Sequence, residues 1–266
     1  MYNTIILVPY RDRLEHMKYF IENYCPILKK NVPNSKVVFI EQDFSNNYFN
    51  RGMLLNIGFD LYKDKTKFYI THDVDIIPNE TIIQELFNIN NYDVVKIFTG
   101  GKLSFGGIMK FSHDDIFFVN GFPNYIWGWG IEDRVLYYRH KILNINYRDS
   151  NYGIDKNKKN KTPAVRAKGF GFSLQKGLGS TAKGGVKSSG PQNIIFLPHK
   201  HNGNNTHPRN YSSKNNISDN ENKIYNSNNL ELQKRHIMSS GLNNLKYKIL
   251  EKININDYVE LIKVNI

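Results

Sequence analysis

The sequence predicts an α/β fold, a single domain with a mostly parallel central sheet flanked by helices. In the first half, short runs rich in β-branched and aromatic residues alternate with segments whose apolar residues recur at helical spacing. Such alternation is typical of βαβ units, in which each helix connects two parallel strands. A chain of 266 residues with 40% hydrophobic and 13% aromatic residues can bury one good core, as globular proteins do.

The strands are expected where short apolar runs end at turn residues. These runs are 5–8, 37–40, 68–70, 93–98, 107–111, 144–147 and 194–197. The last two of them are the last strands expected before an Asn-rich tail. Helical spacing covers 14–28, 51–62 and 132–142. Ser112, with Asp115 three residues later, begins a further short helix.

Two segments lack sustained periodicity. Residues 151–192 are rich in Gly, Lys and Ser and are expected to form a mobile insertion within one domain that spans 1–266. They contain nine Lys or Arg residues and one acid, so they supply +8 of the net charge of +12. A solvated loop is favoured over a contact with nucleic acid or another anionic surface, and we expect no specific nucleic-acid partner. Residues 202–229 are rich in Asn and Ser and are also expected to be loop-like.

Polar residues that directly follow predicted strands give the first indication of a site. Arg11 and Arg13 follow the first strand, and Asp73 and Asp75 follow the third. Ligands of parallel sheets bind outside the carboxyl ends of the strands. Two carboxylates spaced i, i+2 can share a divalent cation and a ribose, and a cation such as Mn²⁺ or Mg²⁺ offsets the charge on a departing diphosphate. A solvated turn is the alternative interpretation of this pattern.

A second candidate for metal binding follows the apolar run 194–197. Alternate residues of a strand point the same way, so His199 and His201 can converge on one ion. Two imidazoles and one carboxylate suit Mn²⁺ and leave positions for phosphate oxygens. An H-x-H pattern in a loop is also found without any metal.

Both tryptophans of the chain fall in the segment 120–133, just ahead of an acidic pair. Indole rings stack against sugar faces, and the glycines that follow Trp127 and Trp129 let the backbone approach a ligand closely. Glu132 and Asp133 start a predicted helix beside this aromatic wall, where a carboxylate can act as a general base. Core packing of both tryptophans is the alternative.

These segments resemble the motifs of the beta-1,4-galactosyltransferase family. Residues 8–13, with Glu15-His16, and residues 49–59 are similar to its two nucleotide-binding signatures, and 73–78 to its D-V-D motif. Residues 105–107 are similar to its F-G-G motif, and 120–133 to N-G-F-P-N-x-x-W-G-W-G-x-E-D. Residues 240–247 resemble its C-terminal block, and the matches follow the family's order. The resemblance implies a GT-A fold and an inverting, Mn²⁺-dependent transfer of a sugar, with galactose favoured, from a UDP-sugar to a hydroxyl of a saccharide or glycoprotein acceptor.

The resemblance also implies a role for individual residues. Asp133 would deprotonate the attacking hydroxyl, while Glu132 and Trp129 would shape the pocket between donor and acceptor. Asp75 would be the metal ligand of the D-V-D motif, together with His199 and His201. Contacts with the nucleotide-sugar would come from Pro9, Arg11, Arg13, Phe49, Arg51, Asp73, Val74, Gly107 and Trp129.

Three departures from the family pattern leave the donor and the acceptor open. The His199-x-His201 spacing resembles the xylose-galactosylating branch, whereas other members use Met-x-x-His. Ser104 stands where lactosamine-making members have a Tyr, and Arg134 replaces a common acidic residue. Transfer of GalNAc, Glc or GlcNAc is the main alternative, and a non-catalytic sugar-binding relative is another.

The cysteine content and the N-terminal sequence bear on the cellular compartment. The single cysteine, Cys25, cannot form an intrachain disulfide and is interpreted as a small apolar helix residue. The apolar run 5–8 is too short to span a bilayer, and no signal peptide follows Met1. The chain as given is expected to be cytoplasmic, with the Golgi lumen as the alternative if it is a fragment.

Overall fold

The computed structural model describes residues 1–99, 102–128, 130–150, 164–166, 194–197 and 217–266. Its strands are β1 (Tyr2–Tyr10), β2 (Ser35–Gln42), β3 (Thr66–His72), β4 (Ile76–Pro78), β5 (Val94–Phe98), β6 (Ile108–Ser112), β7 (Tyr147–Asp149), β8 (Ala164–Arg166), β9 (Ile194–Phe196), β10 (Lys248–Asn254) and β11 (Val259–Asn265). Its helices are α1 (Leu14–Tyr19), α2 (Cys25–Asn31), α3 (Arg51–Leu61), α4 (Glu80–Ile82), α5 (His113–Phe118), α6 (Glu132–Ile142), α8 (Ile217–Tyr225) and α9 (Leu230–Ser239). The π-helical turns η1 (Phe20–Tyr24) and η2 (Ile83–Phe87) extend α1 and α4, and η3 (Leu242–Asn244) is a 3₁₀ turn.

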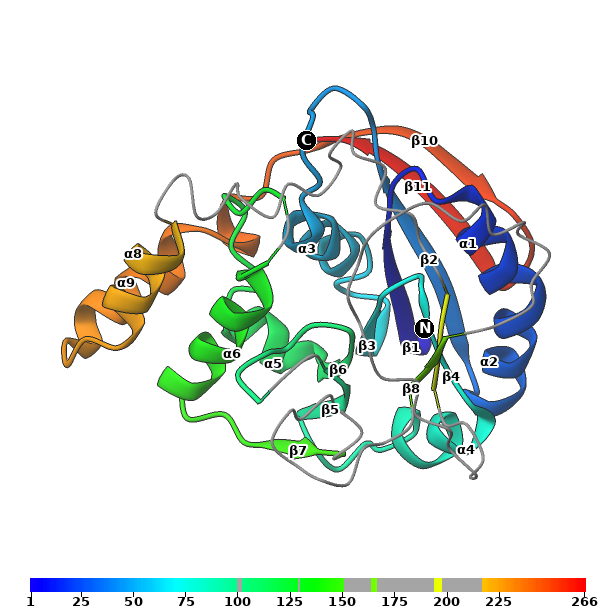
Figure 1. Ribbon diagram of the computed structural model, residues 1–266, viewed down its shortest axis with the longest axis horizontal. Coiled ribbons are helices and arrows are strands. Elements are labelled where there is room, and N and C mark those ends of the chain that lie inside the picture. Colours follow the sequence, from blue (N-terminus) through cyan, green and yellow to red (C-terminus); the bar gives the residue numbers. More distant parts are fainter. Residues whose placement is uncertain (100–101, 129, 151–163, 167–193, 198–216) are drawn as a thin grey trace.

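A mixed, mostly parallel sheet forms the centre of the molecule (Figure 1). The strand order is β10-β11-β2-β1-β3-β6-β5-β7. The pairs β11–β2, β2–β1, β1–β3 and β5–β7 are parallel, and β10–β11, β3–β6 and β5–β6 are antiparallel. The fold class predicted from the sequence is therefore confirmed.

Strand β1 shows why helices cover both faces of the sheet. Its side chains alternate between the faces, so Ile6 and Val8 pack with α1, η1, α2 and η2, whereas Ile5 and Leu7 pack with α3. All four side chains are fully buried. The same alternation across the neighbouring strands produces two cores, one on each face.

Polar caps set the beginning of two helices that matter for the site. The side chain of Asn50 accepts a hydrogen bond from the Met53 backbone and so begins α3. Ser112 caps α5 through the Asp115 backbone N–H, as the sequence predicts. Cys25 is buried at the start of α2, which agrees with its interpretation as an apolar helix residue.

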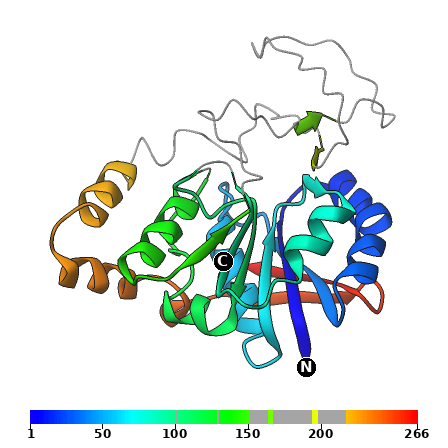
Figure 2. The same cartoon turned by 90° about the horizontal axis from the view of Figure 1, so that it is seen from below.

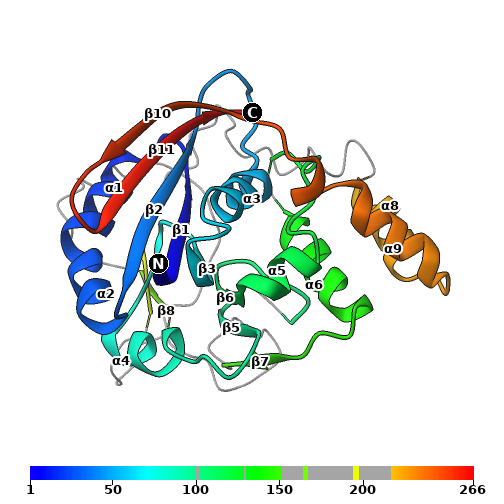
Figure 3. The ribbon, with the colours of Figure 1, turned by 180° about the vertical axis from the view of Figure 1, so that it is seen from behind.

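The C-terminal region corrects two predictions (Figure 3). Residues 194–197 are not the last strand, because the hairpin of β10 and β11 follows and β11 pairs in parallel with β2. The predicted loop 202–229 contains helix α8 from Ile217, which packs against α9 and α6. Figure 3 shows α8 and α9 on the opposite side of the molecule from the hairpin.

Two further predictions need smaller corrections. The strand predicted at 144–147 begins later, as β7 at Tyr147–Asp149. Asn144 adopts a left-handed conformation with φ of 55° and belongs to the turn that closes α6. The segment 151–192 lies outside the described residues except for β8, whose backbone pairs with β9. Within the described chain, no helix combines the length and apolarity needed to cross a bilayer.

Candidate active site

Charged residues lie at the carboxyl ends of two neighbouring strands. Arg11 and Arg13 follow β1, and Asp73 and Asp75 follow β3. Strand β1 runs upward from the N-terminus marked in Figure 2, so its carboxyl end lies at the upper end of the strands in that view. Because β3 is its parallel neighbour, the residues that follow the two strands share this edge. Nη1 of Arg13 lies 2.9 Å from Oδ2 of Asp75, so the segments after β1 and β3 are in direct contact.

Arg51, the first residue of α3, connects this edge to α6. Its Nε donates a 2.8 Å hydrogen bond to Oδ1 of Asp73, and its Nη1 lies 3.9 Å from Oε1 of Glu132. Within the described part of the chain, the buried Nη1 and Nη2 have no hydrogen-bond partner. Buried guanidinium N–H groups without an acceptor favour an anionic ligand.

Arg11 is a second buried cation, 8% exposed, immediately after β1. Its Nη2 donates to the carbonyl of Asn46 at 2.6 Å, and its guanidinium lies 4.9 Å from the centre of the exposed Phe44 ring. Burial lowers its pKa, although the charges of Asp43 and Asp12 oppose this shift. Among the described residues, Nε and Nη1 have no acceptor, so they too can bind an anion.

Glu132 lies at the first position of α6 and is 7% exposed. Burial raises the pKa of its carboxyl group to about 7, the charge of Asp133 adds to this shift, and Arg51 opposes it. Its Oε2 has no hydrogen-bond partner in the described ranges. A carboxyl group that changes protonation near neutral pH is typical of general acids and bases.

Asp133 is held on both carboxylate oxygens. The Ser104 hydroxyl donates a 2.5 Å hydrogen bond to Oδ2, and the Arg134 backbone N–H donates to Oδ1 at 2.7 Å. Gly106 passes so close that a Cβ atom there would lie 2.8 Å from Oδ2. The segment before β6 therefore fixes the orientation of this carboxylate, and a side chain at Gly106 would displace it.

The backbone is strained directly before the two carboxylates. Ile131 has a φ of 70°, in the left-handed region that β-branched residues avoid, at a cost of about 1–3 kcal/mol. The loop that leads to it is tied to the start of α3, because the Gly128 N–H donates to the Phe49 carbonyl at 2.8 Å. Strain of this kind persists where the surrounding structure enforces it, and it is common at active sites.

A set of asparagines that the sequence analysis did not single out holds the loop 120–124 against α3. The Asn56 amide donates to the carbonyl of Phe122 at 2.7 Å and to Oδ1 of Asn124 at 2.8 Å. Asn50 donates to the Asn124 carbonyl at 2.8 Å. These side chains couple α3, which begins with Arg51, to the loop that precedes α6. Their signal in the sequence is a polar amide within an otherwise apolar helix.

Four other residues were predicted to contact the nucleotide-sugar, namely Pro9, Phe49, Val74 and Gly107. Pro9 is within β1, while Phe49 and Val74 pack into the core and are 9% and 5% exposed. Gly107 has a φ of 75°, and a Cβ there would lie 2.5 Å from the Phe98 carbonyl oxygen. A glycine is thus required by the backbone at this position, and its predicted contact with a ligand stays a prediction.

Three predicted site residues, Trp129, His199 and His201, lie outside the described residues. The segment that leads to His199 nevertheless starts beside Asp75, because the Leu197 N–H donates to the Asp75 carbonyl at 2.8 Å. Strand β9 also pairs with β4, which begins at the residue after Asp75. In the part of the chain described, no cluster of three His, Cys, Asp or Glu side chains could hold a metal ion.

The chain is similar in sequence to known proteins over about half of its length. Residues 1–85 match the N-terminal region of glycosyl transferase group 7, and residues 91–161 match a family model described as the N-terminal domain of galactosyltransferase. Human beta-1,4-galactosyltransferase 4 is 35% identical over 138 residues, which are 48% of this chain and 39% of the relative. Bovine beta-1,4-galactosyltransferase 1 is 34% identical over 146 residues, which are 52% of this chain and 36% of the relative. The matched region thus spans well under half of the length of these curated relatives.

A solved structure has the same fold as this chain. It is a mutant of Drosophila beta-1,4-galactosyltransferase 7 in complex with manganese, UDP-Gal and xylobiose, and it superposes with a TM-score of 0.66 at 18% identity. The superposition covers 100% of this chain and 94% of the other. Sequence and fold agree, and the chain belongs to the beta-1,4-galactosyltransferase family.

Proposed function

We propose that this chain is an inverting glycosyltransferase that transfers a sugar, galactose in the first instance, from a UDP-sugar to a hydroxyl of a saccharide acceptor. The observation that carries this proposal is the chain of contacts from Asp73 through Arg51 to Glu132, beside Asp133. It connects the arginines at the carboxyl ends of the strands, which can bind a diphosphate, to the carboxylates of Glu132 and Asp133. Such a pairing of an anion site with a base is what an in-line displacement at an anomeric carbon requires. We take residues 1–266 to form one catalytic domain.

The donor diphosphate would bind at the arginines. Arg11 and Arg51 both offer buried N–H groups that lack an acceptor among the described residues. Arg13 would add a third cation at the same edge. Guanidinium groups bind phosphate oxygens with charge-assisted hydrogen bonds, so together they would hold the leaving group while it departs.

A divalent cation, Mn²⁺, would complete the donor site. When bound, it would stabilise the negative charge on the departing diphosphate. Asp75 offers the carboxylate oxygen that such an ion prefers, and Leu197, two residues before His199 in the sequence, donates a hydrogen bond to the Asp75 carbonyl. In this proposal Asp75, His199 and His201 are the protein ligands.

Asp133 would act as the base that accepts the proton of the attacking hydroxyl. The Ser104 and Arg134 hydrogen bonds orient its carboxylate and leave further lone pairs available. Glu132, which changes protonation near pH 7, would hydrogen-bond a sugar hydroxyl next to the reacting carbon. One displacement with a base on the acceptor side inverts the anomeric configuration.

A second candidate function is transfer of an N-acetylated sugar. Ser104 is small and lies beside Asp133, so it leaves more room than a tyrosine at the donor's C2 position would. A beta-1,4-N-acetylglucosaminyl-transferase from Lymnaea stagnalis is 32% identical over 143 residues, which are 49% of this chain and 28% of the relative. Use of both UDP-Gal and an N-acetylated donor is therefore our expectation.

Release of UDP from a panel of UDP-sugars tests the proposal. Purified protein is incubated with Mn²⁺, with each of UDP-Gal, UDP-GalNAc, UDP-Glc and UDP-GlcNAc, and with saccharides such as xylobiose. We expect acceptor-dependent UDP release with UDP-Gal, and the Asp133→Asn variant serves as the negative control. No acceptor-dependent release with any donor, despite measurable UDP binding, would indicate a sugar-binding relative that does not catalyse transfer.

A further inference from the structure

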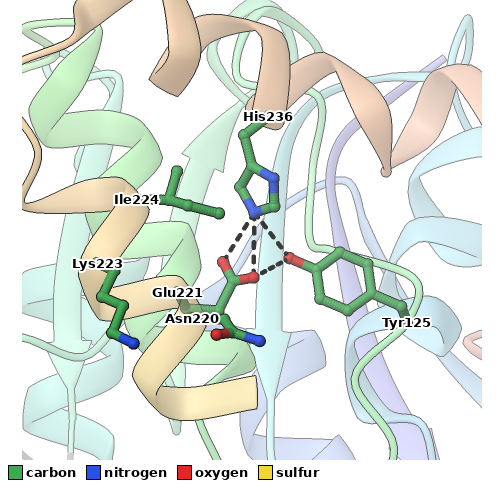
Figure 4. A pocket seen from close by; sticks show the side chains of 6 residues that line it. All are labelled: Tyr125, Asn220, Glu221, Lys223, Ile224 and His236. Carbon is green, nitrogen blue, oxygen red and sulfur yellow. Dashed lines mark hydrogen bonds and ion pairs between the residues drawn. The ribbon is translucent and has the colours of Figure 1, made fainter. Parts of the chain in front are cut away.

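A pocket of about 510 Å³ lies between the loop after α5 and the helices α8 and α9 (Figure 4). Its lining comes from three segments that are distant in sequence. Tyr125 belongs to the loop, Asn220, Glu221, Lys223 and Ile224 belong to α8, and His236 belongs to α9. None of these residues belongs to the charged cluster at the ends of β1 and β3.

A hydrogen-bonded triad forms one wall of the pocket (Figure 4). The Tyr125 hydroxyl donates to Oε1 of Glu221 at 2.6 Å, and Nε2 of His236 lies 3.0 and 3.1 Å from the two carboxylate oxygens. Glu221 is 5% exposed, so this carboxylate is a buried acceptor whose geometry is fixed. Among the residues that the structure describes, Oε2 accepts a hydrogen bond only from His236, so it retains acceptor capacity for a hydroxyl.

The rest of the lining adds the other chemistry that a sugar ring needs. Ile224 and the Tyr125 ring supply an apolar surface, while the exposed Asn220 and Lys223 supply hydrogen-bond donors at the mouth. Small-ligand sites combine apolar walls with a few fixed polar groups, and aromatic rings pack well against the C–H face of a sugar. A polyhydroxylated ring satisfies all of these groups together.

The pocket is connected to the proposed active site through the loop that carries Tyr125 and through the packing of α6. Tyr125 precedes Ile126 and Trp127 in the loop that ends at Glu132. Ile126 packs with Val135 of α6, Tyr225 of α8 and Ile237 of α9 in one apolar cluster. The helices that line the pocket are therefore packed against the helix that begins with the two proposed catalytic carboxylates.

We propose that this pocket is an acceptor subsite that binds the sugar residue next to the one that receives the transferred sugar. The proposal rests on the proposed transferase function. Glu221 and His236 bind ring hydroxyls, Tyr125 packs against the ring, and Asn220 and Lys223 hold its outer edge. The enzyme therefore prefers an acceptor of two or more sugars to a monosaccharide with the same reacting residue.

Kinetics with matched acceptors test the subsite. The double variant Asn220→Ala, Lys223→Ala alters only exposed residues, and Lys234→Ala is the matched control because it removes an exposed lysine from α9 outside the pocket. Acceptor KM is measured for xylose against xylobiose, and for N-acetylglucosamine against N,N′-diacetylchitobiose. The double variant is expected to raise KM for the preferred disaccharide about five- to tenfold, as the loss of one or two hydrogen bonds does, and to leave monosaccharide KM within about twofold. Lys234→Ala is expected to change neither value.

Glu221→Gln tests the buried wall, and its unfolding temperature is measured beside its kinetics. Loss of the disaccharide preference in a variant that folds supports the subsite. An equal loss on monosaccharide and disaccharide in both variants would overturn it and identify the triad as a structural fastening of α8 and α9. If no donor gives transfer, the proposed function fails, and ligand-observed NMR with the two disaccharides decides the pocket. Unchanged disaccharide binding by the double variant overturns the subsite there as well.

Discussion

The hydroxyl of Ser104 donates a 2.5 Å hydrogen bond to Oδ2 of Asp133, and the Gly106 N–H in turn donates to the same hydroxyl at 3.2 Å. A side chain that the proposed function places near the donor sugar is thus also bound to the proposed base. Substitutions at Ser104 change two properties together, namely the room in the pocket and the support of Asp133. The two effects can be separated because alanine removes only the hydrogen bond, whereas tyrosine also fills space.

For Ser104→Ala, we expect kcat to fall by about three- to tenfold with UDP-Gal and with UDP-GalNAc alike. The reason is the loss of one hydrogen bond that orients Asp133, worth about 0.5–1.5 kcal/mol. For Ser104→Tyr, the ring occupies the space of the N-acetyl group. Its kcat/KM for UDP-GalNAc is expected to drop by roughly ten- to a hundredfold more than that for UDP-Gal. An unchanged donor ratio in the tyrosine variant would mean that Ser104 does not border the donor sugar.

Asp133→Asn retains the volume of the side chain and removes its ability to accept a proton. We expect turnover to fall by about 10²–10⁴-fold, the range typical of the loss of a general base. Binding of UDP with Mn²⁺, measured by calorimetry, should stay close to wild type because the arginines and Asp75 are unaltered. Normal turnover in this variant would assign the role of base to another group, with Glu132 the first candidate.

Glu132 makes folding stability depend on pH. Its pKa is about 7 in the folded protein against the ordinary 4.5, so between these values the folded state holds a proton that the unfolded chain has released. The stability due to this group is complete below pH 4.5 and is lost as the pH rises through 7. Relative to wild type, Glu132→Gln is therefore expected to gain about 2–3 kcal/mol in the free energy of unfolding between pH 5 and pH 8.

Urea unfolding at the two pH values measures this gain. Glu22→Gln is the control, since Glu22 is exposed on η1 and its variant should follow the wild-type dependence on pH. If the difference between Glu132→Gln and wild type does not change with pH, Glu132 is ionised throughout, and it can bind a sugar hydroxyl only as an acceptor.

Metal dependence follows from the proposed ligands. Activity should vanish with excess EDTA and return with Mn²⁺ better than with Ca²⁺, because two imidazoles and one carboxylate suit the transition metal. Asp75→Asn should raise the Mn²⁺ concentration needed for half-maximal activity by at least about tenfold. Asp64→Asn, in the exposed turn after α3, is the matched control. Full activity in EDTA would exclude this metal site.

Much of the fold could be predicted because burial leaves a periodic trace in the sequence. The runs in β1 and β2 are buried on both faces, and α3 buries eight of its residues, so their apolar patterns were clear. Strand β10 is exposed along its whole length and shows no such pattern. Its partner β11 joins the sheet beside β2, a pairing between distant parts of the chain that no local signal encodes.

Helix α8 was missed for a related reason. Its Asn- and Ser-rich neighbourhood is typical of loops, and its helical state depends on tertiary contacts such as those of Tyr225 with α6 and α9. The same contacts form the pocket around Glu221, so this site also was not predictable. Charged pairs at strand ends were predictable because sheet topology brings them together, whereas the Ser104–Asp133 hydrogen bond depends on a loop conformation.

The most direct test of the central claim is to determine the anomeric configuration of the product by proton NMR. UDP-α-galactose, Mn²⁺ and a saccharide acceptor from the UDP-release panel are mixed with wild-type protein and, separately, with Asp133→Asn. We expect a new β-linked galactose signal with wild type and only a trace of it with the variant. An α-linked product, or a β-linked product formed equally fast by both proteins, would contradict an inverting displacement with Asp133 as its base.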